Sequence, residues 1–173
     1  MLNKAYVEIT NQCNLSCAFC PKTRRPPRRM SAAEFAAAAE ALQGHVRFLY
    51  LHLMGEPLSH PELGEILNIA GQKGFRVCIT TNGTLLEQRS AVLTAHAAVL
   101  HKLSVSLHAL EGSGVGLSMD AYLKSVWSVC SLLRGQGVHC ALRLWNEGGA
   151  AERNGRRLIA VTIADPNDWA DHA

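Results

Sequence analysis

The stretch "RVCITTNGTLLEQRSAVLTAHAAVLHKLSVSL", residues 76–107, decides the fold class of this chain. Its first six residues and its last six, Lys102–Leu107, form two short apolar segments rich in β-branched side chains, which predicts two buried strands. Between them, a segment from Thr84 to about Ala97 predicts a helix, opened by a capping box of Thr84 and Glu87. Two strands joined by a helical crossover pair in parallel, so the stretch predicts an α/β architecture.

The same alternation continues on both sides of this unit. Further strands are predicted at Ala5–Thr10, Arg47–Leu53 and Val138–Trp145, and further helices at Ser31–Gln43, Ser59–Lys73 and Met119–Arg134. Ser31 with Glu34, and Ser59 with Glu62, have the spacing of two more capping boxes. Glycine-rich residues 112–116 lack the frame of a dinucleotide-binding motif and predict a flexible loop.

The C-terminal segment is less regular. Residues 150–164 are predicted as a fifth helix, although "VTIA" at 161–164 favours a strand. A sixth strand is missing or degraded, so we expect the fifth strand to be left as an exposed edge. We expect a single domain over residues 1–173, with a recognisable core at 1–149 and an incomplete or divergent part at 150–173. We also expect the chain to be truncated, or to depend on a partner that covers this edge.

Composition excludes several classes of protein. The chain is 48% hydrophobic with a mean hydropathy of +0.04, and no apolar run is long enough for a membrane helix. Without an N-terminal signal pattern, we expect a cytoplasmic protein that does not engage membranes. Five basic residues lie between Lys22 and Arg29, and without them 12 basic residues face 14 acidic ones. The positive charge is therefore local, which argues against a nucleic-acid-binding surface.

Three cysteines with the spacing Cys13-x3-Cys17-x2-Cys20 point to a metal site. Thiolates select zinc, copper(I) or iron–sulfur clusters, and a closed site would need a fourth ligand. A [4Fe–4S] cluster held by three cysteines leaves one iron open to a chelating small molecule, whereas a zinc site stays a weaker alternative. The remaining cysteines lie inside apolar elements and are expected to be buried and inert: Cys78, Cys130 and Cys140.

Polar residues also gather where the predicted strands end, which is where parallel α/β folds bind ligands. These residues include "MGEPL" at Met54–Leu58, "TNG" at Thr81–Gly83, Ser104, Ser106, His108, Arg143 and Asn146. Gly55 lets the main chain approach a ligand, and Pro57 removes a donor and keeps Glu56 extended. This strand end suits a cation such as an ammonium group, or is a plain turn with a solvated Glu56. Likewise, His108 is either a cavity residue or a neutral histidine bonded to a nearby carbonyl.

The cysteine motif, with Phe19 before its third cysteine, resembles that of the radical S-adenosylmethionine (SAM) enzymes. "MGEPL" resembles their GGEP-type motif, with Met54 in place of the first glycine. "TTNGTLL" and "LSVSLHA" resemble their third and fourth strands, and the resemblance covers Tyr6–Asn146.

The resemblance implies a partial (β/α)6 TIM-like barrel that holds a [4Fe–4S] cluster through Cys13, Cys17 and Cys20. SAM would chelate the open iron, and its amino group would meet Gly55, Glu56 and Pro57. Phe19 would lie against the adenine, and Ser106 would contact SAM. Further cavity residues for SAM or substrate would be Asn82, His108, Arg143 and Asn146.

The activity implied is reductive cleavage of SAM to a 5′-deoxyadenosyl radical, which takes a hydrogen atom from a small molecule or a peptide. Two alternatives stay open: a non-catalytic iron–sulfur module and a zinc-binding structural module. The basic loop, Lys22–Arg29, is a solvated linker, an anion site, or a dock for a flavodoxin-like electron donor.

Overall fold

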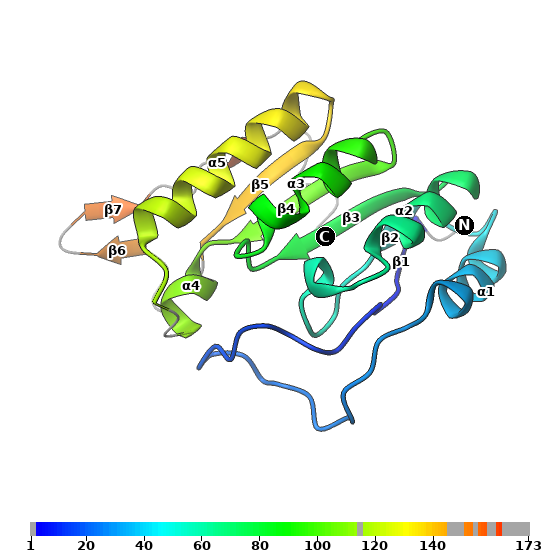
Figure 1. The fold of residues 1–173 in the computed structure, drawn as a ribbon, viewed down its shortest axis with the longest axis horizontal. Coiled ribbons are helices and arrows are strands. Elements are labelled where there is room, and N and C mark those ends of the chain that lie inside the picture. The colour runs from blue at the N-terminus through cyan, green and yellow to red at the C-terminus, as the bar shows by residue number, and fades with distance from the viewer. Residues whose placement is uncertain (1–2, 114–115, 145–150, 154–155, 159–161, 164–173) are drawn as a thin grey trace.

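A computed structural model describes residues 3–113, 116–144, 151–153, 156–158 and 162–163, and shows an α/β fold (Figure 1). Its main sheet has the order β1-β2-β3-β4-β5-β8. The strands are β1 (Lys4–Tyr6), β2 (Phe48–Tyr50), β3 (Arg76–Thr81), β4 (Leu100–Ser106), β5 (His139–Arg143) and β8 (Thr162–Ile163). The helices are α1 (Ala32–Leu42), α2 (Leu63–Gln72), α3 (Leu86–Ala95), α4 (His108–Ser113) and α5 (Met119–Gly135).

Strands β1 to β5 are parallel, and α1, α2, α3 and α5 lie on one face of the sheet (Figure 1). Alternate strand residues on this face, such as Leu49, Ile79 and Leu103, are fully or almost fully buried against the helices. Burial of this apolar area drives the fold. The opposite face carries polar and aromatic side chains, among them Tyr6 and Tyr50, whose ring centroids are 4.9 Å apart.

The central βαβ unit is confirmed, and β3 has the predicted bounds. Other strands are shorter or shifted: β1 ends at Tyr6, and Thr10 instead forms an isolated antiparallel bridge with Arg29. The chain therefore leaves the sheet early, so that residues 11–30 form a long irregular segment before α1.

Only the first of the three predicted capping boxes forms. The Ser31 side chain accepts from the Glu34 amide, and the Glu34 carboxylate accepts from the Ser31 amide. The Ser59 box is wrong, because Pro57–Ser59 form a 3-10 turn whose Ser59 hydroxyl donates to the Glu56 carbonyl. The Thr84 box is wrong as well, because the Thr84 hydroxyl donates to Asn82 and α3 begins later. Both side chains form tertiary or turn bonds that compete with capping.

The predicted helix at 150–164 is wrong. The described residues there form strands β6 (Ala151–Arg153) and β7 (Arg156–Leu158), which pair with each other, and β8. Strand β8 confirms the strand character of "VTIA" and runs antiparallel to β5, opposite Cys140 and Ala141. The edge of β5 is therefore partly covered, contrary to the prediction.

The loop predicted after β4 is also shorter than expected, because α4 occupies residues 108–113. His108 begins this helix, so it does not continue the strand parity of Ser104 and Ser106. Helix α4 lies beside the irregular segment that follows β1, since the Cys17 thiol donates to the Ala109 carbonyl at 3.4 Å.

Candidate functional site

The cysteine loop, residues 13–20, leaves β1 on the side where the parallel strands end (Figure 1). The Asn11 side chain joins the two ends of this loop. Its amide nitrogen donates to the Pro26 carbonyl at 2.8 Å, and its amide oxygen accepts from the Arg28 main-chain amide at 2.7 Å. The Thr10 hydroxyl adds a bond to the Arg28 carbonyl at 3.2 Å. These bonds join residues 10–11 to residues 26–28, so the segment that carries the cysteines is anchored at both ends.

The three thiols of this loop are free and differ in exposure: Cys13 is exposed, Cys20 half-buried and Cys17 buried. Burial raises the pKa of Cys13 and of Cys17, and the neighbouring cysteines add to this rise in both. Two ionised thiolates in one loop would raise each other's pKa in this way. Such a group is stabilised as thiolates only when a positive centre is bound among them.

The turn after β2 packs against residues 10–12, which lead into the cysteine loop. Gly55 has φ +78°, and a Cβ atom there would lie 2.5 Å from the Thr10 carbonyl oxygen and 2.7 Å from that of Gln12. The Glu56 amide donates to the Gln12 carbonyl at 2.8 Å. Glycine is required here both for the backbone conformation and for the close approach, which joins the two motifs physically.

Glu56 is buried, with 1% of its surface exposed. Its carboxylate accepts from the Leu58 amide at 3.0 Å, the Thr81 hydroxyl at 2.8 Å and the Asn82 amide at 2.7 Å. Burial raises its pKa, while these three donors act in the opposite direction. The carboxylate thus joins the end of β2 to the end of β3. The alternative prediction, a plain turn with a solvated glutamate, is wrong. Its predicted contact with an amino group stays a prediction.

Asn82 links three parts of the site. Its side-chain amide donates to Asn14 at 2.9 Å and to the Cys13 sulfur at 3.8 Å, while its oxygen accepts from the main chain and hydroxyl of Thr84. The structure therefore places Asn82 beside the cysteine loop.

Four other predicted residues gather near the ends of β4 and β5. Ser106 lies opposite Arg143 in the strand pairing, and His108 bonds the main chain of Arg143. The Phe19 ring from the cysteine loop packs on His108, with ring centroids 5.0 Å apart. Burial lowers the pKa of His108, and the charge of Arg143 adds to this, which favours the neutral imidazole. Asn146 lies outside the described residues.

His52 is a residue that the sequence did not single out. It lies on the sheet face opposite the helices (the open face), beside Tyr6 and Tyr50, and accepts from the Thr80 main-chain amide at 3.3 Å. Burial, with a smaller effect of the Arg143 charge, lowers its pKa to about 4. A neutral histidine therefore lines the open face near Arg143.

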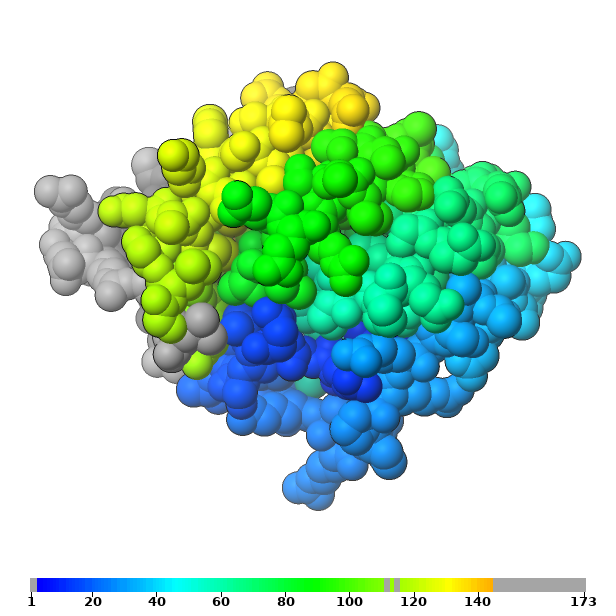
Figure 2. All heavy atoms as spheres, viewed as in Figure 1, coloured from blue at the N-terminus to red at the C-terminus, as the bar shows by residue number. Residues whose placement is uncertain are grey.

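The basic loop is partly neutralised. Arg25 pairs with Glu8 at 2.7 Å, and Arg28 pairs with Glu34 at 2.6 Å. Glu8 also accepts from the Met54 amide at 2.9 Å, so it connects the basic loop to the turn after β2. A groove of about 910 Å³ runs between β1, this loop and α1. In Figure 2 the loop projects from the lower side of the molecule.

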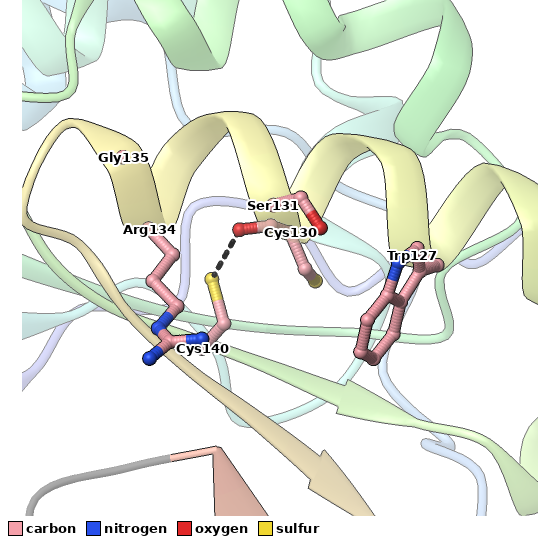
Figure 3. A pocket seen from close by; sticks show the side chains of 6 residues that line it. All are labelled: Trp127, Cys130, Ser131, Arg134, Gly135 and Cys140. Carbon is pink, nitrogen blue, oxygen red and sulfur yellow. Dashed lines mark hydrogen bonds between the residues drawn. The ribbon is translucent and has the colours of Figure 1, made fainter.

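The other three cysteines are buried, as predicted. Cys130 on α5 and Cys140 on β5 border a hollow of about 320 Å³ with Trp127 and Arg134 (Figure 3). The Cys140 thiol donates to the Cys130 carbonyl at 3.6 Å. Contact with Cys140, together with burial, raises the pKa of Cys130, so this thiol stays protonated.

Some residues of the site escaped the sequence reasoning because their role depends on tertiary contacts. Asn14 and Thr84 hold Asn82, Glu8 holds the turn after β2, and Ala109 accepts from Cys17. Asn14 lies between two cysteines, Thr84 was predicted as a helix cap, and Ala109 lies in the motif "LSVSLHA", but none of these signals indicated the observed contacts.

The residues present fit an iron–sulfur cluster. Within the described parts of the chain, no three Cys, His, Asp or Glu side chains are placed to hold a single metal ion. Each cysteine ligand of a cubic cluster binds a different iron, so convergence on one point is not required. Three free thiols on a loop anchored at both ends, with amide donors around Cys13, supply the soft ligands and the surrounding hydrogen bonds that such clusters need.

Curated proteins similar to this chain include a probable GTP 3′,8-cyclase of Methanothermobacter thermautotrophicus, 35% identical over 96% of this chain and 59% of that protein. The subtilosin biosynthesis protein AlbA of Bacillus subtilis is 33% identical over 97% of this chain and 35% of its own length. The chain thus spans less than two thirds of either relative.

Solved structures agree on the fold. BtrN in complex with AdoMet and 2-DOIA is 26% identical, with a TM-score of 0.54 over 72% of this chain and 55% of that one. Streptococcus suis SuiB bound to S-adenosylmethionine is 19% identical, with a TM-score of 0.62 over 80% of this chain and 33% of SuiB, and shows likeness of fold alone. The family model of the radical SAM superfamily matches residues 7–145, and the chain belongs to this superfamily.

Proposed function

We propose that this chain is the core of a radical SAM enzyme, in which Cys13, Cys17 and Cys20 hold a [4Fe–4S] cluster and SAM completes the site. When bound, the cluster supplies one electron that cleaves SAM reductively, giving methionine and a 5′-deoxyadenosyl radical that abstracts a hydrogen atom from a substrate. The protein residues bind, orient and shield, since the cofactors carry the chemistry.

The observation that carries this proposal is the packing of the turn after β2 onto the cysteine loop. Gly55 has no room for a side chain against Thr10 and Gln12, so the two motifs are built as one surface. This contact supports a shared ligand that meets both the cysteines and the main chain of residues 54–57. Such close approach of two backbones is what a preorganised site requires.

The remaining residues are assigned by position. Gly55, Glu56 and Pro57 would receive the amino group of SAM, Phe19 would face the adenine, and Ser106 would contact the nucleoside. His108 and Arg143 would line the cavity beside them, with Asn146 assigned from sequence alone. His52, neutral at physiological pH, adds a hydrogen-bonding group without a competing charge.

The substrate is proposed as a small molecule or a peptide. The names of the relatives describe both kinds: a GTP cyclase, and SuiB bound to the precursor peptide SuiA. A flavodoxin-like donor is proposed to deliver the electron at the basic loop. Within the described residues, Lys22, Arg24 and Arg29 form no ion pair and would face an acidic partner.

We also propose a cytoplasmic location, since a radical mechanism needs a reducing environment. Among the helices described, none has the length and apolar character to cross a membrane.

The test is SAM cleavage after anaerobic reconstitution with iron and sulfide. With dithionite and SAM, we expect 5′-deoxyadenosine and methionine in the wild-type protein and none in Cys17→Ala. An intact cluster that yields no 5′-deoxyadenosine would reduce this chain to a non-catalytic iron–sulfur module. One equivalent of zinc, with no iron–sulfur absorbance, would make it a zinc-binding module.

A further inference from the structure

The three cysteines of the loop differ in what contacts their sulfur atoms. Cys13 accepts from the Leu15 amide at 3.4 Å and from the Asn82 side chain at 3.8 Å. The Cys17 sulfur instead donates to the Ala109 carbonyl. Donors directed at a sulfur stabilise negative charge on it, so Cys13, unlike Cys17, has donor groups placed to support a thiolate ligand.

The orientation of the Asn82 amide follows from unambiguous donors. The Thr84 main-chain amide can only donate, and it lies 3.0 Å from Oδ1 of Asn82. The Thr84 hydroxyl reaches the same oxygen at 2.7 Å. Oδ1 is therefore the acceptor, and the Nδ2 group that faces Cys13 must be the donor.

The Asn82 backbone is fixed as firmly as its side chain. Its amide donates to the buried Glu56 carboxylate at 2.7 Å, and its carbonyl accepts from the Tyr122 hydroxyl at 2.8 Å. Only 8% of Asn82 is exposed. Glu56, Tyr122 and Thr84 thus hold one N–H group beside one sulfur, and this arrangement costs no reorganisation when charge develops there.

We propose that Asn82 is a positioning residue that donates a hydrogen bond to the Cys13 ligand and thereby raises the reduction potential of the cluster. The inference rests on the proposed function, because it needs a cluster on Cys13. The reduced cluster carries one more negative charge, part of which lies on the ligand sulfurs. An N–H group aimed at a sulfur stabilises this state more than the oxidised one.

The test is a redox titration of the reconstituted protein without SAM, followed by electron paramagnetic resonance. Asn82→Ala keeps the main-chain bonds and removes the donor, so we expect a lower potential. The oxidised-to-reduced ratio at a fixed potential should rise about three- to tenfold, where tenfold corresponds to about 59 mV for one electron. Asn82→Asp turns an acceptor toward the sulfur and should lower the potential further.

Two variants make the result interpretable. Asn68→Ala is the matched control, because Asn68 is exposed on α2 and contacts His96. Its potential should equal that of the wild type. Thr84→Val removes one of the two bonds that orient the Asn82 amide, and should give a smaller shift in the same direction even if Asn82→Ala fails to fold.

An unchanged or higher potential in both Asn82→Ala and Thr84→Val, with the cluster content intact, would overturn the proposal. A lowered potential without any 5′-deoxyadenosine would uphold the role of Asn82 while the enzyme assignment fails. Normal SAM cleavage with unshifted potentials would uphold the enzyme assignment and overturn the role of Asn82, so the two proposals can fail separately.

Discussion

The cysteine loop and the pair formed by Cys130 and Cys140 use the same side chain in opposite ways. In the loop, three thiols lie outside regular structure, and amide groups donate to Cys13. In the pair, both thiols lie inside the packing of α5 on β5, and the Cys140 thiol donates to a carbonyl (Figure 3). Amide donors stabilise a thiolate ligand, whereas a carbonyl acceptor stabilises a protonated thiol.

Cys17 of the loop also donates to a carbonyl, that of Ala109. The two regions therefore differ in the amide donors at Cys13 and in whether the thiols lie outside or inside the packing of a helix on the sheet. In the loop, burial raises the pKa of Cys13 and of Cys17, and a bound metal centre would stabilise these sulfurs as thiolates. The buried pair acts as packing material, and contact with Cys140 together with burial keeps the Cys130 thiol protonated.

Removing one cysteine from each region tests the comparison most strongly. Cys17→Ala should abolish the iron–sulfur absorbance after reconstitution, because two cysteines cannot replace three ligands. Cys130→Ala should keep full iron and sulfide content, with only a modest loss of packing. Iron and sulfide analysis provides the measurement, and equal losses in both variants would mean that the ligands are misassigned.

Alkylation of the protein without its cluster sharpens the same contrast. Exposed Cys13 and half-buried Cys20 should react with iodoacetamide at once, while Cys130 and Cys140 are 4% and 2% exposed and react only through opening. We expect a difference in rate of at least about 100-fold. Mass spectrometry of the labelled peptides resolves the sites, and denaturant should abolish the difference. Similar rates in the folded protein would contradict the assigned burial.

A pair of glycine substitutions tests whether the turn after β2 is built onto the cysteine loop. Gly44 and Gly55 share φ +78°, but a Cβ at Gly44 meets no atom within 4 Å. Gly44→Ala should cost about 1 kcal/mol in free energy of unfolding from the left-handed backbone. Gly55→Ala should cost about 1–3 kcal/mol more, because it overlaps Thr10 and Gln12. Urea unfolding measures both, and equal costs would separate the turn from the loop.

The smallest effect concerns pH on the open face. The pKa of His52 is lowered to about 4 in the folded protein from an ordinary value of 6.5. The unfolded chain therefore binds a proton first as pH falls, so stability is lost from about pH 6.5 down to about pH 4. His52→Gln should remove on the order of 1–2 kcal/mol of this pH dependence.

Urea midpoints between pH 7 and 4.5 measure this effect, and the exposed residue His45 offers a matched His→Gln control. Parallel curves for wild type and His52→Gln would show that His52 titrates normally.

Much of the fold follows from periodicity. The unit from β3 to β4 was predictable as two apolar strands joined by a helix, and Ser31 with Glu34 fixed the start of α1. The bounds of β3 were predicted correctly, whereas β4 begins at Leu100 and ends at Ser106 instead of spanning Lys102–Leu107. Ser59 and Thr84 have the same local pattern as Ser31 but bond to Glu56 and Asn82 instead. Local sequence does not reveal such competition, because the competing groups are placed by other contacts.

By itself, the sequence determined the parallel α/β class, the three candidate ligand cysteines and the Gly55–Pro57 turn, because spacing and residue chemistry are local properties. Only the tertiary structure decided that β8 covers part of β5, that Glu56 joins β2 to β3, and that Asn82 donates to Cys13. Those features depend on which strand ends meet in space, and folding brings together groups up to 92 positions apart in the chain, as in the bond from Cys17 to Ala109.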